Sequence, residues 1–210
     1  IIQGSGFHSL GRGFLTSGAS MPAFPSKEGV AQLTKAAHIK SMRIRVLILT
    51  PCAVQLRAEQ VPQTAVQMQQ AVEAALPVDV GVFAAAVADW RVTSASDRKL
   101  KKTQDGLPVL GFTENPDILK TVSHMGAGRP KLVVGFAAET NDVVANATAK
   151  RLRKGCDWIV ANDVSPGTGI MGGAENAVVL ITHDNVESWP RMGKDQVAQQ
   201  LALRISQALE

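Results

Sequence analysis

The stretch VFAAAVADWRVTSASDRKLKK, residues 82–102, is the part of the sequence that decides the predicted fold. It opens with a continuous apolar run that ends abruptly at Asp89. An apolar run of this length between polar residues is typical of a strand buried on both faces, as in a parallel sheet. Ligands of such sheets bind beyond the carboxyl ends of the strands, and Asp89 stands at that end. The cations that follow it, Arg98, Lys99, Lys101 and Lys102, suit a polyphosphate with its metal.

Outside this stretch, segments with helical periodicity alternate with short apolar runs. The pattern predicts helices over 64–76, 115–125, 142–154 and 195–209. It predicts buried strands over 80–88, 131–137, 157–161 and 177–182, with a short extended piece over 107–112. Strands that alternate with helices indicate an α/β fold, in which a parallel sheet carries helices on both faces.

The first part of the chain differs from the rest in composition. Residues 1–60 are rich in Gly, Ser and Pro, and they contain one candidate strand, Arg45–Thr50, and one short helical segment near 30–38. We therefore expect an atypical N-terminal segment over 1–60, irregular and poorly ordered or degenerate. Residues 61–210 are expected to form a single α/β domain.

Charge and composition exclude several classes of function. The 210 residues carry a formal net charge of +4, but residues 1–58 hold seven of the basic residues and one acidic residue. No basic stripe with interleaved aromatic residues occurs, so nucleic-acid binding is not expected. No apolar run is long enough to span a bilayer, and no signal peptide is recognised, so the expected location is the cytoplasm, with no membrane partner. The two cysteines, Cys52 and Cys156, have neither disulfide nor metal-ligand spacing.

Several polar residues have both a structural and a functional interpretation. Asp89 is either a loop carboxylate or a contact to metal or ribose at the edge of the sheet. Lys99 and its basic neighbours form either a solvated face or a lid that closes over phosphates. Phe136 is either a core residue or a surface on which a base stacks. Lys150 and Lys154 share one face of a helix near its C-terminus. They either interact favourably with the negative end of the helix macrodipole or reach a triphosphate.

A glycine-rich segment raises a different possibility. Residues 167–172, GTGIMG, match the spacing of a dinucleotide-binding fingerprint. That fingerprint must join a strand to a helix, and here the strand-like run 177–182 follows instead. A substrate loop is therefore favoured, and a nicotinamide-dependent oxidoreductase is the weakest of the alternatives. The four histidines are scattered without ligand spacing, so the sequence leaves the metal ligands unknown.

Six blocks of sequence, taken in order, resemble one enzyme family. They are AAVADWR (85–91), KLKK (99–102), ENPDIL (114–119), VVGFAAET (133–140), KRLRKGCD (150–157) and VANDVS (160–165). Their order and spacing closely resemble phosphopantothenate–cysteine ligase, the second module of the bacterial bifunctional coenzyme A biosynthesis flavoprotein. The resemblance runs from about residue 80 to the C-terminus. It implies a Rossmann-like parallel sheet with a small antiparallel extension.

The resemblance also implies a reaction. Ligases of the bacterial type use CTP with Mg²⁺, and the carboxylate of 4′-phosphopantothenate attacks the α-phosphate to give an acyl-cytidylate and pyrophosphate. The amine of cysteine then displaces CMP, and the product is 4′-phosphopantothenoyl-cysteine. Phosphoryl chemistry of this kind depends on positioning and charge neutralisation more than on a protein nucleophile.

By the same resemblance, individual residues of this chain acquire expected roles. Lys99 would be the catalytic residue of the lid, in contact with nucleotide phosphate. Phe136 would pack on the nucleotide. The remaining expected nucleotide contacts are Phe83, Ala84, Ala85 and Asp89 at the cytidine end, Asn115, Pro116, Asp117 and Ile118 around base and ribose, and Lys150 and Lys154 at the triphosphate.

The resemblance weakens toward the N-terminus. Family members carry a glycine-rich block and an Asn-x-Ser-Ser-Gly segment, and this chain has only the faint echo LTSGAS at 15–20, with no Asn-x-Ser-Ser-Gly. Two functions therefore stay open: the ligase itself, and a catalytically incomplete remnant that keeps dimerisation and nucleotide binding. The family also implies a homodimer and association with a flavin-dependent decarboxylase module.

Overall fold

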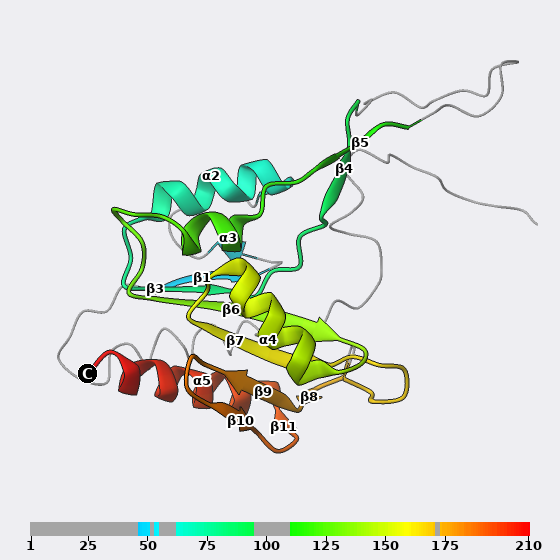
Figure 1. The fold of residues 1–210 in the computed structure, drawn as a ribbon, viewed down its shortest axis with the longest axis vertical. Helices are drawn as coiled ribbons and strands as arrows, with labels where there is room; N and C mark the ends of the chain where they lie inside the picture. Colours follow the sequence, from blue (N-terminus) through cyan, green and yellow to red (C-terminus); the bar gives the residue numbers. More distant parts are fainter. Residues whose placement is uncertain (1–45, 51–52, 55–61, 95–109, 171–172) are drawn as a thin grey trace, which may run out of the picture.

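The structure is a computed structural model that describes residues 46–50, 53–54, 62–94, 110–170 and 173–210. These residues form three layers, with one sheet between two layers of helices (Figure 1). The sheet has seven strands in the order β10-β9-β7-β6-β3-β1-β2. Its four central strands, β7, β6, β3 and β1, run parallel. At one end of the sheet β2 is antiparallel to β1, and at the other β9 is antiparallel to both β7 and β10.

The sheet is built from short apolar segments. Its strands are β1 (Val46–Thr50), β2 (Ala53–Val54), β3 (Val80–Phe83), β6 (Leu132–Glu139), β7 (Trp158–Asp163), β9 (Val178–Ile181) and β10 (Val186–Ser188). All four residues of β3 are buried, as are the first four of β6, because helices cover both faces. This is the arrangement that the apolar run predicted.

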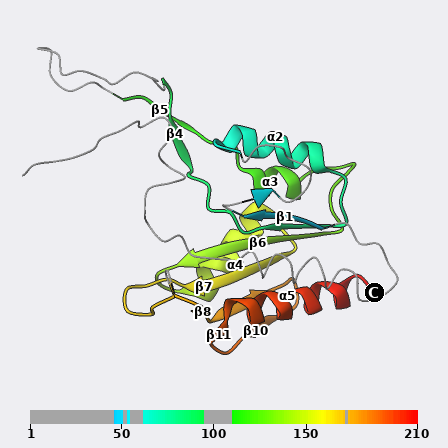
Figure 2. The ribbon, with the colours of Figure 1, turned by 180° about the vertical axis from the view of Figure 1, so that it is seen from behind.

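Side chains along each strand alternate between two cores. The helix α5 (Lys194–Ala208) packs on one face, where Val197 and Leu201 meet Val82 and Val134. The helices α2 (Ala65–Ala75), α3 (Ile118–Ser123) and α4 (Val143–Lys154) cover the opposite face, around Leu47, Val133 and Ile159. Figure 2 shows α5 alone on its side of the sheet. Cys156 is buried in the core on the α4 side.

The ends of the helices follow from local sequence. The Thr64 hydroxyl accepts a hydrogen bond from the Gln67 amide at 3.2 Å and caps α2. Gly155 ends α4 in the left-handed conformation, at φ 71°, and donates its amide to the Arg151 carbonyl at 2.9 Å. A side chain at this position would displace the His124 ring, because a Cβ built there would lie 2.6 Å from it.

Two small antiparallel sheets accompany the main one. The pair β8 (Glu175–Asn176) and β11 (Met192–Gly193) lies before α5. The pair β4 (Trp90–Val92) and β5 (Phe112–Glu114) forms an arm that projects from the body (Figure 1). Periodicity did not predict these pairs, because segments of two or three residues are too short to show it.

Two of the predicted boundaries were wrong. The strand predicted over 80–88 ends at Phe83, because β1 and β6 pair with it only that far. The helix predicted to start at Asn115 starts at Ile118, because Asp117 caps it by accepting the Lys120 amide at 3.1 Å. The side chain of Asn115 instead donates to the Ala88 carbonyl.

The predicted α/β class is confirmed, with a mostly parallel sheet, helices on both faces and small antiparallel additions. The candidate strand over 45–50 is present as β1, which pairs with β3 in the main sheet. The division at residue 60 lies outside the described residues and stays a prediction. Across the described part of the chain, no helix combines the length and apolar character that a bilayer crossing requires.

Candidate functional site

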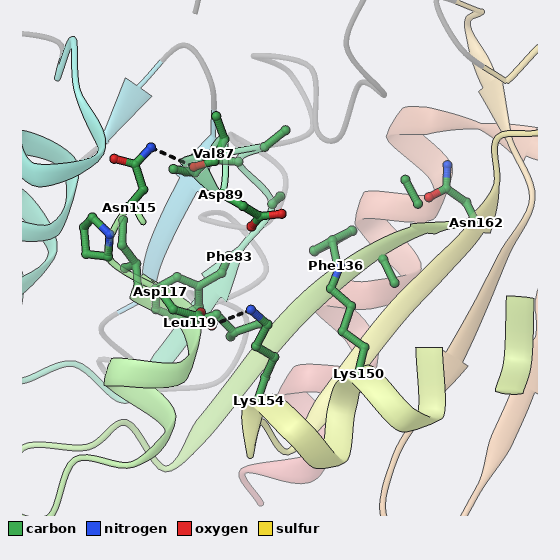
Figure 3. Close-up of a pocket in the computed structure, with 18 of the residues that line it drawn as sticks. Phe83, Val87, Asp89, Asn115, Asp117, Leu119, Phe136, Lys150, Lys154 and Asn162 are labelled. Atoms are coloured by element: carbon green, nitrogen blue, oxygen red, sulfur yellow. Dashed lines mark hydrogen bonds and ion pairs between the residues drawn. The ribbon is translucent and has the colours of Figure 1, made fainter. Parts of the chain in front are cut away.

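A cavity of about 330 Å³ lies at the carboxyl ends of the parallel strands, where the sequence predicted a ligand site. It is built by the segment after β3, the start of α3, the last turns of α4 and the ends of β6 and β7, with one residue each from β8 and β9 (Figure 3). Its polar lining comprises Asp89, Asn115, Asp117, Lys150, Lys154, Asn162 and Asn176.

The segment after β3 forms one wall of the cavity. Residues 84–89 run on from the strand with small side chains, and they line the cavity as far as Asp89. Asn115 holds this wall in place, because its side chain donates to the Ala88 carbonyl and its amide donates to the Asp89 carbonyl, both at 2.8 Å. The two stems of the β4–β5 arm are therefore joined directly at the cavity wall.

The two lysines of α4 face the cavity with different partners. Lys154 forms an ion pair with Asp117. Lys150, one turn earlier, forms no hydrogen bond or ion pair with any described residue. Burial lowers the pKa of Lys150, with Lys154 and Arg153 adding to this, while Glu139 and Asp89 act against it. Lys150 is thus a partly buried cation without a bonded anion among the described residues. Binding of a phosphate group beside it would be favourable, because the phosphate would supply charge-assisted hydrogen bonds.

The cavity bends around the carboxyl edge of the sheet. Lys150 and Lys154 reach it from α4, on one face. Phe136 and Val178 belong to the core on the other face, where α5 packs. In Figure 3 Lys150 extends toward Phe136, and Asn162 lies beyond Phe136, away from Asp89. A ligand that fills the cavity therefore spans a charged part near α4 and an uncharged part on the α5 side.

Sequence reasoning missed two residues of this uncharged part. Asn162 and Asn176 line the cavity, and these residues are only 8% and 3% exposed. The Oδ1 atom of Asn176 is buried without a hydrogen-bond partner. A signal was available for Asn162, because it follows a buried run at a strand's carboxyl end, as Asp89 does.

The residues predicted from the sequence as nucleotide contacts lie around this cavity. Every one of those that the structure describes lines it, namely Phe83, Ala84, Ala85, Asp89, Asn115, Pro116, Asp117, Ile118, Phe136, Lys150 and Lys154. The predicted catalytic residue, Lys99, lies outside the described residues. Residues 167–170 follow β7 in a turn that leads to β8, so this stretch does not join a strand to a helix.

Comparison with known proteins identifies the family of this chain. Residues 27–209 match the family described as DNA/pantothenate metabolism flavoprotein C-terminal domain. A curated relative, the coenzyme A biosynthesis bifunctional protein CoaBC of Escherichia coli, is 39% identical over 141 residues, which is 66% of this chain and 34% of the relative. The CoaBC of Vibrio cholerae is 36% identical over 138 residues, or 65% of this chain and 34% of the relative. The chain thus spans about a third of the length of these relatives.

The fold has a solved counterpart. The crystal structure of the C-terminal domain of CoaBC superposes with a TM-score of 0.62 at 28% identity, covering 89% of this chain and 84% of that one. The resemblance stated from the six sequence blocks is therefore confirmed. This chain belongs to the family of the DNA/pantothenate metabolism flavoprotein C-terminal domain, the domain that in CoaBC proteins serves coenzyme A biosynthesis.

Proposed function

We propose that this chain is a CTP-dependent ligase that joins 4′-phosphopantothenate to cysteine. The observation that carries the proposal is the gathering of the predicted nucleotide contacts around one cavity at the carboxyl edge of the sheet. The cavity offers cations on one side and small, uncharged wall residues on the other. This composition suits a triphosphate joined to a nucleoside and an acyl chain.

The phosphates are assigned to the α4 side of the cavity. Lys150 has free donor capacity there, and Lys154 adds a second cation one turn away. Ammonium groups on long stems can follow a phosphate chain as its geometry changes during reaction. The base and ribose are assigned to the segment 115–118, and Phe136 provides an aromatic surface between the two regions.

The site also fits the Mg²⁺ ion that a nucleoside triphosphate carries. No group of three acidic, His or Cys side chains is clustered among the described residues. Mg²⁺ at such sites requires one or two carboxylates, because substrate phosphates and water supply the other oxygens. Asp89 is exposed at the cavity wall, and its carboxylate has no described hydrogen-bond or salt-bridge partner, so Asp89 would hold the ion. The bound ion would neutralise charge on the phosphates.

The proposed reaction has two steps. In the first, a carboxylate oxygen of phosphopantothenate forms a bond to the α-phosphorus of CTP, and pyrophosphate leaves with the electrons of the broken P–O bond. In the second, the cysteine amine attacks the acyl carbon, and CMP leaves as the amine loses a proton. The cavity contributes by alignment and by neutralising charge, and Lys99 is proposed to close over the phosphates.

The assay that tests this function measures pyrophosphate release from CTP with phosphopantothenate and cysteine present. We expect release that depends on all three substrates, and the Lys99→Ala variant should lose turnover while keeping the fold. CTP binding without pyrophosphate release would favour the second candidate, a catalytically incomplete relative. The observation that favours this candidate is the missing Asn-x-Ser-Ser-Gly segment. Absence of both binding and release would contradict either function.

Two features of the assembly belong to the same proposal. The chain is proposed to act as a homodimer, and to work beside a flavin-dependent decarboxylase that consumes its product. The second feature is supported by the curated relatives, which are described as bifunctional and of which this chain matches about a third. Sedimentation of the purified chain tests the dimer.

A further inference from the structure

Lys194 is a buried cation that the proposed reaction does not use. It is the first residue of α5, it is only 8% exposed, and it does not line the cavity. Its ammonium group has no hydrogen-bond or ion-pair partner among the described residues. Burial lowers the pKa of Lys194, and no neighbouring carboxylate acts against this effect. A buried ammonium group without an anion is unfavourable, because water no longer solvates the charge.

The backbone places this side chain at the N-terminus of α5. The Lys194 amide donates to the Ala174 carbonyl at 3.1 Å, so the helix begins directly beside the β8–β11 pair. Side chains of a helix lean toward its N-terminus, and Lys194 therefore extends past the start of α5. The N-cap residue is Gly193, which has no side chain to cap the helix. The ammonium group and the positive end of the helix dipole thus lie close together.

A second buried donor lies in the segment that leads into α5. Trp189 is 4% exposed, in the core against which α5 packs, and its Nε1 atom has no hydrogen-bond partner. Its amide donates to the Val178 carbonyl at 2.9 Å, so the segment 189–194 runs beside residues 174–178. The side chains of lysine and tryptophan are donors only, and neither can satisfy the other. The group that both lack is an acceptor.

The charge of the site defines this acceptor further. An ammonium group at a helix N-terminus favours an anion, and an oxyanion offers several acceptor atoms at once. A water molecule would accept hydrogen bonds but would leave the charge uncompensated. Asp195, the acidic residue of the first turn, is exposed and does not act on the pKa of Lys194. The ligand class is therefore a small oxyanion from solution.

We propose that the start of α5 binds a phosphate-type oxyanion, held by the Lys194 ammonium group and the helix dipole, with the Trp189 indole N–H as a further donor. The oxyanion is either a free phosphate ion or the phosphate end of a larger metabolite. The site is separate from the substrate cavity, because neither side chain lines that cavity. Binding compensates the buried charge and stabilises the folded protein.

The test measures thermal midpoints and calorimetric titrations with inorganic phosphate, against chloride at the same ionic strength. Lys150→Met is the background, because it removes a phosphate contact proposed for the cavity. In this background phosphate should raise the thermal midpoint above its value in chloride. Adding Lys194→Met should lower the affinity for phosphate by about tenfold or more and abolish that rise. In chloride alone Lys194→Met should raise the midpoint, since the buried charge is removed.

Two further variants in the same background locate the site. Trp189→Phe keeps an aromatic ring but removes the donor, so the affinity for phosphate should fall by about two- to tenfold. Lys131→Met is the matched control, because the Lys131 side chain is 73% exposed, and its affinity for phosphate should stay unchanged. Methyl phosphate distinguishes the two sources of the anion. Binding as tight as that of inorganic phosphate assigns the end of a larger phosphate ester, and weaker binding assigns the free ion.

The outcomes are independent of the ligase proposal, which depends on CTP and pyrophosphate. A midpoint that is the same in phosphate and chloride would overturn the oxyanion site, as would equal phosphate affinity with and without Lys194→Met. An equal loss of affinity in Lys131→Met would show that the effect is one of general charge, and it too would overturn the site. If Lys194→Met does not fold, Lys194→Gln keeps the comparison.

Discussion

At the scale of single residues, Lys150 has the most informative environment. It is partly buried in the cavity wall, and the unfavourable burial of its charge lowers its pKa from 10.5. The folded protein therefore binds fewer protons at this group than the unfolded chain does, wherever the pH lies between the lowered pKa and 10.5. Within that range the contribution of Lys150 to stability increases with pH, and below it the contribution stays unfavourable.

The first prediction follows from this environment. Lys150→Met keeps the apolar stem and removes the charge, so the ligand-free variant should be more stable than the parent at neutral pH. Its affinity for CTP should fall by about tenfold or more, because a charge-assisted hydrogen bond to phosphate is lost. Thermal unfolding between neutral and alkaline pH measures the first effect, and calorimetric titration measures the second.

The pH dependence provides the control for this prediction. The difference in stability between Lys150→Met and the parent should shrink as pH rises through the lowered pKa, since the parent's lysine then becomes neutral. A difference that stays constant over that range would show that packing, not charge, is responsible. A variant that binds CTP like the parent would remove Lys150 from the phosphate site.

The residue scale also shows what the sequence could and could not predict of the site. Asp89, Lys150 and Lys154 were assigned to a nucleotide site through the resemblance to the ligase family, because their residue types and spacing alone left a structural and a functional interpretation open. Asn162 and Asn176 were not, because the meaning of an asparagine depends on burial and on missing partners. Both properties are set by neighbours far away in the sequence.

At the scale of elements, Gly155 determines how α4 ends and hence where its lysines point. Its φ of 71° lies in the left-handed region, and a built Cβ would lie 2.6 Å from the His124 ring. A side chain at this junction is therefore unfavourable for two independent reasons. Arg151, Arg153 and Lys154 in the last turn also match the negative end of the helix dipole.

The second prediction concerns this junction. Gly155→Ala should lower the free energy of unfolding by about 1–3 kcal/mol, as for other non-glycine residues held in the left-handed region. Urea denaturation measures it. Gly126→Ala is the control, because a built Cβ there meets nothing within 4 Å, and its φ is not in that region. Equal losses in the two variants would contradict the role given to Gly155.

Elements were predicted well where they were long and poorly where they were short. The helices α2, α4 and α5 were predicted to within a few residues, because each buries a regularly spaced apolar face. The end of β3 was misplaced, since an apolar sequence continues past the last residue that has a partner strand. The start of α3 was misplaced because Asn115 and Asp117 are both good capping residues, and only tertiary contacts decide between them.

At the scale of the whole molecule, the carboxyl ends and the amino ends of the parallel strands have different roles. The carboxyl edge holds the cavity. The opposite edge is held by Asp157, whose carboxylate accepts hydrogen bonds from Arg129 at 3.0 Å and from the Val133 amide at 2.7 Å. Arg129 also donates to the Ser123 and Pro130 carbonyls. One ion pair therefore joins the end of α3 to the starts of β6 and β7.

The third prediction uses this separation. Arg129→Met should lower the free energy of unfolding by about 1–3 kcal/mol, because it leaves a charged acceptor without its main donor. CTP affinity should stay at the level of the parent, since the cavity lies at the other edge. Lys131→Met is the control: its ion pair with Asp79 spans 3.8 Å, and the lysine is 73% exposed, so little stability should be lost.

Denaturant unfolding and calorimetric titration of the same preparations test this prediction. A loss of CTP affinity in Arg129→Met that matches its loss of stability would show that the two edges are coupled. A loss of stability in Lys131→Met as large as in Arg129→Met would show that the stabilisation at these strand ends is not specific to the Arg129–Asp157 ion pair.

The projecting arm has one mechanical consequence. Asp89 precedes its first strand and Asn115 follows its second, and these two residues are hydrogen-bonded to each other and also line the cavity. A movement of the arm is therefore expected to displace the residues of the cavity wall through that junction. Trp90 and Phe112 are 58% and 64% exposed on the arm, so a molecule that bound these two side chains would be connected through the arm to the wall of the cavity.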